Sequence, residues 1–315
     1  MANKLKTYTI LTLLVIGLVF LGIGCAEKNS GGSAPAQNIS SEGAPVQEAT
    51  ASEAPQGTDA SGEQSISVKG SDTILPLAQA EAEEFMNESS GKSVSVTGGG
   101  SGVGIAALID GQVDIATASR EINANETEAA KKNGINPVEH SIAYDGITAV
   151  VNPANPVSEL TFDQLRGIYN GSISNWKEVG GEDKPIAVIS RDSSSGTYKD
   201  FQKDVMLGDE YRPDALTQPA TGGVVGEVSQ NPNAIGYIGF AYIDNSIKAL
   251  SLDKGNGSVT PTAESILNGA YPLSRALYFY TNGEPSGPTK EFIDFVLSEK
   301  GQNLVSEVGY IPLKK

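Results

Sequence analysis

The chain has 315 residues, with 22 Lys and Arg against 38 Asp and Glu, so its formal net charge at pH 7 is −16. This excess of negative charge disfavours nucleic acids and anionic membranes as partners, and a site for an anion would have to rely on local donors. With one cysteine, Cys25, and one histidine, His140, the chain can form neither an internal disulfide nor a Cys/His metal cluster.

The N-terminal segment has the pattern of an export signal. Two lysines precede an apolar run over residues 8–23, and a glycine stands directly before Cys25. This order resembles a lipoprotein signal, although Gly22 occupies the position where such signals usually carry leucine. We predict a signal peptide over residues 1–24 and lipid attachment at Cys25. The alternatives are a plain signal peptide and an uncleaved anchor helix.

The following segment, residues 25–65, is rich in Ser, Gly, Ala, Pro, Gln and Glu, and Ile39 and Val46 are nearly its only large apolar residues. Such a composition cannot offset the entropy lost on ordering the chain. We therefore predict a flexible acidic tether here. About 250 residues remain for the folded part, enough for one large domain or two lobes.

Strands alternate with helical segments along the folded part. We predict strands at residues 66–68, 93–97, 113–116, 147–151, 185–189, 234–240 and 276–280, and helices at 74–86, 105–109, 121–134, 160–169, 198–206, 292–297 and 304–308. This alternation is typical of the α/β class. Ligand clefts in such folds lie where strand ends meet helix starts, between lobes.

The turn Ser190–Thr197 lies between a predicted strand and a predicted helix. It contains one guanidinium, four serine hydroxyls, one threonine hydroxyl and a glycine. A turn at a helix start presents free backbone N–H groups and the positive end of the helix dipole. Together with Arg191, these groups predict a site for a small tetrahedral oxyanion.

Two earlier turns have the same position between a strand and a helix. Residues 70–73 read Gly-Ser-Asp-Thr, and residues 98–104 are a glycine run with one serine. Glycines let the backbone approach a ligand closely, and this run lacks the Gly-Lys-Ser/Thr ending of a Walker A loop. The alternatives are helix capping by Ser71 or Thr73 and a flexible loop without a ligand.

Two Asn-Pro pairs, at residues 152–153 and 155–156, follow the strand that ends at Val151. They break this strand and mark a crossover between lobes. We expect the chain to return near residue 245. The predicted division is therefore a first lobe made of residues 66–149 and 245–315 and a second lobe made of residues 150–244.

The second lobe is predicted to begin with a capped helix. Thr161 and Gln164 have the spacing of a capping box, and Leu160 and Leu165 have the spacing of a hydrophobic staple. The single tryptophan, Trp176, is expected to pack against its own loop, with contact to a ligand as the alternative.

The three polar turns occur in a fixed order with three other segments, Ile168–Gly171, Asn175–Gly181 and Ile235–Tyr237. Together they resemble the phosphate-binding protein of the high-affinity phosphate ABC importer, over residues 66–315. The resemblance implies a two-lobed periplasmic-binding-protein-like fold whose ligand cleft lies between the lobes and closes on phosphate by a hinge motion.

The resemblance also implies a function outside the cytoplasm. The protein would bind inorganic phosphate and deliver it to the transmembrane permease subunits of an ABC importer. It would be a monomer without a cofactor or metal, tethered to the outer face of the cell membrane by lipid at Cys25 or by the N-terminal helix. A receptor for another tetrahedral oxyanion, such as sulfate, molybdate or tungstate, is the alternative.

The binding site implied by the resemblance is shared among the three turns. The residues that match the family's pattern are Thr73, Ile74, Ser101, Arg191, Ser195, Gly196 and Thr197. The last four carry its Arg-x-x-x-Ser-Gly-Thr motif, and Thr73 and Ile74 supply a hydroxyl and backbone N–H groups.

The sequence departs from the family's pattern at Arg120. Several members carry an aspartate near this position, where it accepts the proton of the phosphate. Asp145, beside the next predicted strand, is the candidate replacement, while Arg120 would add positive charge to the site or pair with a carboxylate at its rim. A carboxylate at the ligand accepts from HPO₄²⁻ and repels sulfate, which carries no proton.

An exported phosphohydrolase is the alternative from a different class. Ser195 would be its nucleophile, but His140 is the one histidine available as a base and no triad motif surrounds the serine. We therefore predict a binding protein without catalytic residues. A surface adhesin or scavenger without a transporter is a third class, and it fits the oxyanion chemistry poorly.

Overall fold

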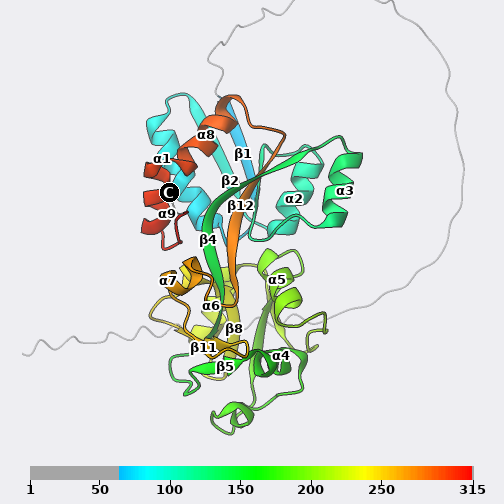
Figure 1. Ribbon diagram of the computed structural model, residues 1–315, viewed down its shortest axis with the longest axis vertical. Helices are drawn as coiled ribbons and strands as arrows, with labels where there is room; N and C mark the ends of the chain where they lie inside the picture. Colours follow the sequence, from blue (N-terminus) through cyan, green and yellow to red (C-terminus); the bar gives the residue numbers. More distant parts are fainter. Residues whose placement is uncertain (1–63, 314–315) are drawn as a thin grey trace, which may run out of the picture. The chain divides into compact units, whose positions relative to one another are not determined.

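The computed structural model describes residues 64–313 (Figure 1). The predicted signal peptide, Cys25 and the predicted tether up to residue 63 lie outside the described residues. Within residues 64–313, none of the helices has the length and apolar character needed to cross a bilayer.

Helices and strands alternate along the described residues. The strands are β1 (Gln64–Gly70), β2 (Lys92–Thr97), β3 (Ile115–Ala118), β4 (Pro137–Val151), β5 (Glu159–Thr161), β6 (Ala187–Arg191), β7 (Leu216–Gln218), β8 (Ala234–Gly239), β9 (Lys248–Ala249), β10 (Ser251–Asp253), β11 (Ser258–Val259) and β12 (Ser274–Asn282). The α-helices are α1 (Leu75–Glu88), α2 (Ser101–Ile109), α3 (Ala124–Lys132), α4 (Phe162–Asn170), α5 (Gly196–Asp204), α6 (Thr221–Gln230), α7 (Ala263–Leu267), α8 (Gly287–Leu297) and α9 (Glu299–Glu307). Two 3₁₀ turns, η1 (Trp176–Val179) and η2 (Phe240–Tyr242), complete the order.

Two long antiparallel strands, β4 and β12, lie side by side in the centre of the folded part (Figure 1). The sheet has the order β2-β1-β3-β12-β4-β8-β6-β7, with β9 also on β4. We call the part built on β1–β3 with α1–α3, α8 and α9 the first lobe. The part built on β6–β8 with α4–α7 is the second lobe.

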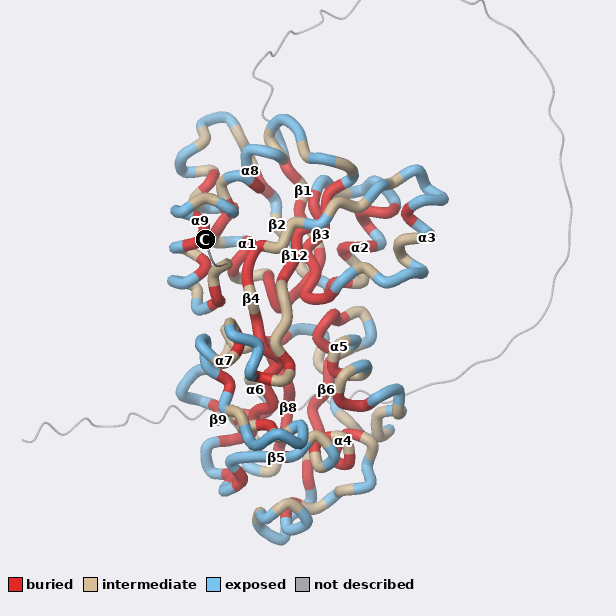
Figure 2. Tube along the Cα trace, in the orientation of Figure 1, coloured by how far each residue is buried: buried red, intermediate tan, exposed pale blue. Residues whose placement is uncertain are grey.

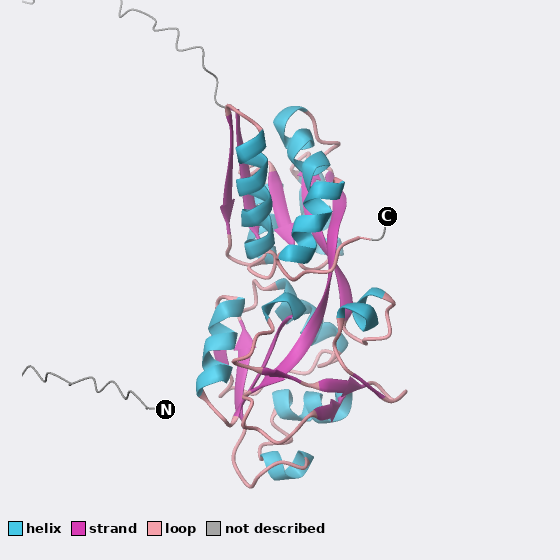
Figure 3. Cartoon of the chain, turned by 90° about the vertical axis from the view of Figure 1, so that its left-hand side faces the viewer, coloured by secondary structure: helices cyan, strands magenta, loops and turns pink. Residues whose placement is uncertain are grey.

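Each lobe has its own buried core of apolar side chains, contributed by its strands and its helices. Buried positions follow the strands of each lobe, and helices lie beside these strands (Figures 2 and 3). In the first lobe Ile66 and Phe279 of the sheet pack with Phe85 of α1 and Phe292 of α8. In the second lobe the sheet packs against α4 and α5. The α/β class and the two-lobed arrangement predicted from the sequence are confirmed.

The chain re-enters the first lobe later than the sequence predicted. Residues beyond 245 still belong to the second lobe, because β9 pairs with β4, β10 pairs with β5, and Leu250 and Tyr271 lie in the second-lobe core. The return takes place along β12, which starts at Ser274. The polar turn near residue 245 leads only into another short strand.

Several predicted boundaries were also displaced. The helices expected from residues 292 and 304 begin at Gly287 and Glu299, and two other displacements bear on the polar turns. The strand expected at residues 147–151 begins at Pro137, so Asp145 lies in the interior of β4 rather than at the edge of a strand. The helix expected from residue 105 begins at Ser101, inside the glycine run. A Cβ on Gly104 would collide with the backbone of Lys69 and Gly70, so glycine here lets α2 lie directly on β1.

Other local predictions are confirmed. Thr161 and Gln164 form a reciprocal capping box at the start of α4. Trp176 is buried in the second-lobe core, and its indole N–H donates to the Asn233 carbonyl at 2.9 Å. The helix α6 was not predicted, since its Thr-Gly-Gly start carries no strong helix signal.

Candidate functional site

The polar turns of the two lobes meet. In the first lobe β1 and β3 are parallel, so the turns that follow them lie at one edge of the sheet. In the second lobe β6 is parallel to both β7 and β8, and their carboxyl ends likewise share an edge. We call the region where these two edges face each other the interlobe site.

Direct contacts join the lobes at this site. The hydroxyl oxygens of Thr73 and Thr197 lie 2.9 Å apart. The Gly102 N–H donates to the Ser194 carbonyl at 2.9 Å, and the Ser194 hydroxyl donates to the Gly99 carbonyl at 3.0 Å. The predicted first-lobe turns and the turn Ser190–Thr197 are therefore in contact.

The start of α5 lies at the centre of the interlobe site. Ser195 is the N-cap of this helix, and its hydroxyl accepts from the Tyr198 N–H at 3.3 Å. Ser195, Gly196 and Thr197 are all buried. The first amides of a helix have no partner within the helix, so the buried start of α5 offers N–H donors and positive dipole charge to an anion.

Gly196 allows α5 to approach the first lobe closely. A Cβ at this position would collide with the hydroxyl oxygens of Ser101 and Ser119. These two hydroxyls lie 3.3 Å apart, and the Ser119 N–H donates to Ser101 Oγ at 3.0 Å. Because Ser101 is the first residue of α2, the starts of α2 and α5 face each other across the site.

The start of α1 supplies two further predicted residues, Thr73 and Ile74. Both are buried. The Ile74 N–H donates to the Ser71 carbonyl at 3.2 Å, which closes the turn before α1. The phenol groups of Tyr310 and Tyr242 donate to the carbonyls of Thr73 and Asp72, each at 2.6 Å, and hold this turn from the side of the lobe connection.

Arg191 is fixed in place by several acceptors. Its guanidinium donates to Thr221 Oγ1 at 2.8 Å, to the Pro219 carbonyl at 2.9 Å and to Asp72 Oδ2 at 3.2 Å. The side chain is 2% exposed. Burial lowers the pKa of Arg191 from its ordinary value, and the charge of Asp72 opposes this shift. Its Nε–H also donates to the Gln218 carbonyl at 3.3 Å. The planar guanidinium is thus oriented by its surroundings and keeps one N–H, on Nη1, for an oxyanion.

Tyr237 of the neighbouring strand β8 binds the backbone of Arg191. The Arg191 N–H donates to the Tyr237 phenol oxygen at 3.2 Å, and Ser190 Oγ lies 2.9 Å from the same oxygen. The Tyr237 ring stacks on Phe201 of α5 with centroids 4.1 Å apart. Strand β8 therefore fixes both the end of β6 and the start of α5.

Asp145 is more deeply buried than Asp72, the other carboxylate of the interlobe site. Its Oδ1 accepts from the Phe240 N–H at 2.8 Å, and its Oδ2 accepts from the Arg275 guanidinium at 2.8 and 3.1 Å. A Cβ on Gly239 would lie 2.8 Å from Thr73 Cγ2 and 3.1 Å from both Asp145 oxygens, so the carboxylate lies close to the first-lobe turn. Arg275 also donates to Thr197 Oγ1 at 3.0 Å.

Arg120 pairs with a carboxylate, one of the two arrangements that the sequence left open. Its two terminal nitrogens donate to the Glu126 oxygens at 2.8 and 2.7 Å, and one of them also donates to the Glu121 carbonyl. Glu126 completes the capping box of α3 with Asn123 as well. Arg120 is consequently bound to the first lobe beside the interlobe site.

The sequence did not identify four residues that take part in this geometry. They are Asp72, Ser119, Thr221 and Arg275. Asp72 stands within the turn at residues 70–73, and Ser119 directly precedes Arg120, where the sequence departs from the family's pattern. Their carboxyl and hydroxyl groups could have been chosen there. Arg275 and Thr221 carried no local signal, because their contacts with Asp145 and Arg191 depend on strand pairing across the fold.

Comparison with known proteins bears on this site. Residues 47–300 match the model of the PBP superfamily domain. The phosphate-binding protein PstS of Bacillus subtilis is 34% identical over 305 residues, which cover 96% of this chain and 94% of that protein. The chain belongs to the PstS family within the PBP superfamily. PstS of Borreliella burgdorferi is also 34% identical, over 80% of this chain and 91% of that protein.

Solved structures of this family have the same fold. The structure of a phosphate ABC transporter substrate-binding protein from Clostridium perfringens, with bound phosphate, is 37% identical and has a TM-score of 0.73, covering 80% of this chain and all of that chain. An ABC-type phosphate transport receptor from Vibrio cholerae is 35% identical with a TM-score of 0.66, over 79% of this chain and all of that chain. The family is one of substrate-binding proteins.

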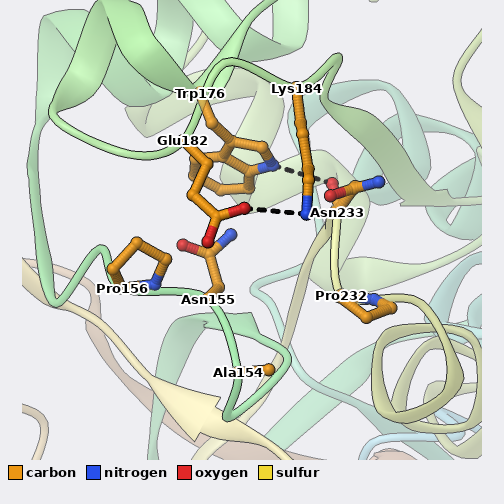
Figure 4. A pocket seen from close by; sticks show the side chains of 8 residues that line it. All are labelled: Ala154, Asn155, Pro156, Trp176, Glu182, Lys184, Pro232 and Asn233. Atoms are coloured by element: carbon orange, nitrogen blue, oxygen red, sulfur yellow. Dashed lines mark hydrogen bonds and ion pairs between the residues drawn. The ribbon is translucent and has the colours of Figure 1, made fainter.

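A cavity of about 240 Å³ lies in the second lobe, and none of its lining residues belongs to the interlobe site (Figure 4). Trp176, Glu182, Lys184 and Asn233 line it. Its polar groups bind one another, since Lys184 pairs with Glu182 at 2.7 Å and the Trp176 indole donates to Asn233. The interlobe site, with donors from two lobes, is the better candidate for a ligand of this family.

Proposed function

We propose that this protein binds inorganic phosphate outside the cytoplasm and delivers it to the permease of an ABC importer. The observation that carries this proposal is the meeting of the starts of α1, α2 and α5 at the contact between the lobes. The buried guanidinium of Arg191 binds Asp72 in the turn before α1. Such a site offers a tetrahedral dianion many fixed donors in a setting that excludes water. The names of the relatives support phosphate as the anion.

The proposed ligand contacts follow the sequence prediction. They are Thr73, Ile74, Ser101, Asp145, Arg191, Ser195, Gly196 and Thr197. Arg191 supplies the charged donor, and the start of α5 supplies amides and hydroxyls. The amide of Ile74 now closes its own turn and would have to share its hydrogen with the ligand.

Selectivity for phosphate would come from Asp145. This carboxylate accepts three hydrogen bonds, from Phe240 and Arg275, whereas two carboxylate oxygens offer about four acceptor positions. One position is left for the proton of HPO₄²⁻, and sulfate has no proton to give. The proposal therefore favours phosphate over sulfate, molybdate and tungstate.

The Asp145→Asn variant tests this selectivity. An amide can donate to a sulfate oxygen, so the ratio of phosphate affinity to sulfate affinity should fall by at least about tenfold. Competition of sulfate against radioactive phosphate in equilibrium dialysis measures the ratio. An unchanged ratio would show that another group accepts the proton. Asp209→Asn, a change of a partly exposed carboxylate paired with Arg166, is the control.

We infer that no catalytic step takes place at the site. The Ser195 hydroxyl caps α5, and His140 lies within hydrogen-bond distance of Thr281 in the first lobe.

Membrane attachment at Cys25, a monomeric state and contact with permease subunits complete the proposed function. Retention of radioactive phosphate by the purified chain, with sulfate, molybdate and tungstate as competitors, tests the function itself. Equal competition by all anions would contradict it.

A further inference from the structure

Two consecutive peptide groups in the turn before α1 are each held at the carbonyl end by a tyrosine. The Asp72 carbonyl accepts from the Tyr242 phenol at 2.6 Å. The Thr73 carbonyl accepts from the Tyr310 phenol, also at 2.6 Å. The N–H groups of the same two peptide groups are those of Thr73 and Ile74. Because the C=O and N–H of a planar trans peptide group point in opposite directions, the phenol bonds direct both N–H groups away from the tyrosines.

The N–H groups of this turn have spare capacity for a ligand. The Thr73 N–H has no acceptor among residues 64–313, and the Ile74 N–H has the Ser71 carbonyl at 3.2 Å. Thr73 is 2% exposed, and its hydroxyl oxygen lies 2.9 Å from that of Thr197 in the other lobe. A buried N–H group without a partner is costly. An anion held between the lobes supplies the acceptor that the fold does not provide.

Helix α1 does not use the two carbonyls that the phenols bind. Ile74 is the N-cap of α1, and its carbonyl accepts the first helical bond, from the Ala78 N–H at 2.9 Å. The carbonyls of Asp72 and Thr73 precede it in the chain. A carbonyl that accepts a hydrogen bond also makes the N–H of its own peptide group a stronger donor, by roughly 10–30% per bond. The phenols therefore orient the two N–H groups and strengthen them as donors.

Both tyrosines are fixed by the segments that carry them. Tyr242 lies in η2, which directly follows β8, and Tyr310 follows α9. The next residue, Ile311, exchanges two backbone hydrogen bonds with Tyr144 of β4, at 2.7 and 3.3 Å, and its side chain lies in the second-lobe core. Burial raises the pKa of both phenols above the ordinary value. Both phenols consequently remain protonated, and able to donate, near neutral pH.

We propose that Tyr242 and Tyr310 are positioning residues for phosphate, which fix the Thr73 and Ile74 amides as donors to the bound ion. The proposal rests on the proposed phosphate function and adds to it two side chains that do not touch the ion. Their effect arises only after the ion has reached the turn. The phenols therefore slow the dissociation of phosphate and leave its association rate unchanged. A purely structural role in the turn would change the unfolding free energy without this effect on dissociation.

The double variant Tyr242→Phe/Tyr310→Phe tests this role, because it removes both phenol donors and keeps both rings. The dissociation constant for inorganic phosphate, measured by calorimetric titration, should rise about tenfold, and the dissociation rate constant should rise by the same factor. In the isotope-labelled chain saturated with phosphate, the nuclear magnetic resonance signal of the Thr73 amide proton should move upfield, because its hydrogen bond to the ion weakens. Each single variant should weaken binding about threefold, which keeps the test available if the double variant does not fold.

Tyr271→Phe is the matched control. This phenol is also buried and donates to a backbone carbonyl, that of Ile147 at 3.0 Å, but the peptide group it binds lies within the pairing of β4 with β8. Tyr271→Phe and Tyr310→Phe should lose similar unfolding free energy, whereas the control should keep its phosphate affinity within about twofold.

An equal loss of affinity in the control would overturn the positioning role. An unchanged dissociation rate and an unmoved Thr73 signal in the test variants would overturn it as well. If the unaltered chain fails to bind phosphate at all, the proposed function falls; binding by the unaltered chain, with the same constants in the double variant, overturns the positioning role alone.

Discussion

Two buried carboxylates, Asp145 in β4 and Glu81 in α1, have opposite surroundings. Asp145 is 1% exposed and receives three hydrogen bonds, two of them from Arg275. Glu81 is fully buried in the first lobe, and neither of its oxygens has a hydrogen-bond partner. The fold thus provides donors for a charge at the contact between the lobes, whereas Glu81 in the core has none and is best accommodated neutral.

The largest expected effect comes from removing the donor of Asp145. Arg275→Ala leaves this buried carboxylate with the Phe240 N–H alone, and loss of one partner of a buried ion pair costs about 3–5 kcal/mol of unfolding free energy. Chemical denaturation measures the loss. Arg166→Ala, which breaks the partly exposed pair with Asp209, should cost less than about 1 kcal/mol. Equal losses would mean that Asp145 has no special dependence on Arg275.

Arg191 extends the comparison to a buried cation. Arg191→Ala removes the charged donor of the interlobe site and should weaken phosphate binding about a hundredfold, because charged partners in buried contacts contribute about 2–5 kcal/mol. Calorimetric titration gives the affinity. Arg212→Ala, whose partner Asp214 is exposed, should leave the affinity within about twofold of the unaltered chain. A near-normal affinity of the Arg191 variant would remove Arg191 from the site.

Glu81 gives the smallest effect per pH unit, and the sign of this effect is fixed by the raised pKa of its carboxyl. Burial raises the pKa of Glu81 to about 8 from an ordinary value of 4.5. Below pH 4.5 the carboxyl is protonated in both the folded and unfolded chain. As the pH rises toward 8 the unfolded chain loses the proton first, so the unfolding free energy falls by up to about 1.4 kcal/mol per pH unit.

The Glu81→Gln variant removes this titration. Its unfolding free energy, measured by urea denaturation between pH 5 and pH 9, should decline less steeply than that of the unaltered chain, with the two curves separating as the pH rises. Glu83→Gln on the exposed face of the same helix should keep the original slope. A slope that stays unchanged in the Glu81 variant would show that Glu81 finds donors in solution.

The parts of the site that the sequence could predict are those formed by a few consecutive residues. The turns at residues 70–73, 98–104 and 190–197 are local features, since a hydroxyl or glycine between a strand and a helix start is visible in a few residues. That Thr73 would lie beside Thr197 followed from the resemblance to a family. The capping box of Thr161 was likewise contained in four residues.

The features that the sequence did not predict depend on pairing between strands that are far apart in the sequence. Arg275 lies opposite Asp145 because β12 pairs with β4 in a particular register, and nothing near residue 275 in the sequence reports that register. The late return to the first lobe has the same origin, since β9 and β10 are two- and three-residue strands that depend on β4 and β5. Side-chain partners between distant strands could not be predicted from periodicity.

A crystal structure of the chain with phosphate bound tests the central claim most directly. We expect phosphate oxygens within hydrogen-bond distance of the Arg191 guanidinium, the amides at the start of α5, and the hydroxyls of Thr73 and Ser101, so that both lobes contact one ion. Phosphate bound to one lobe alone, or in the second-lobe cavity beside Trp176, would contradict the account.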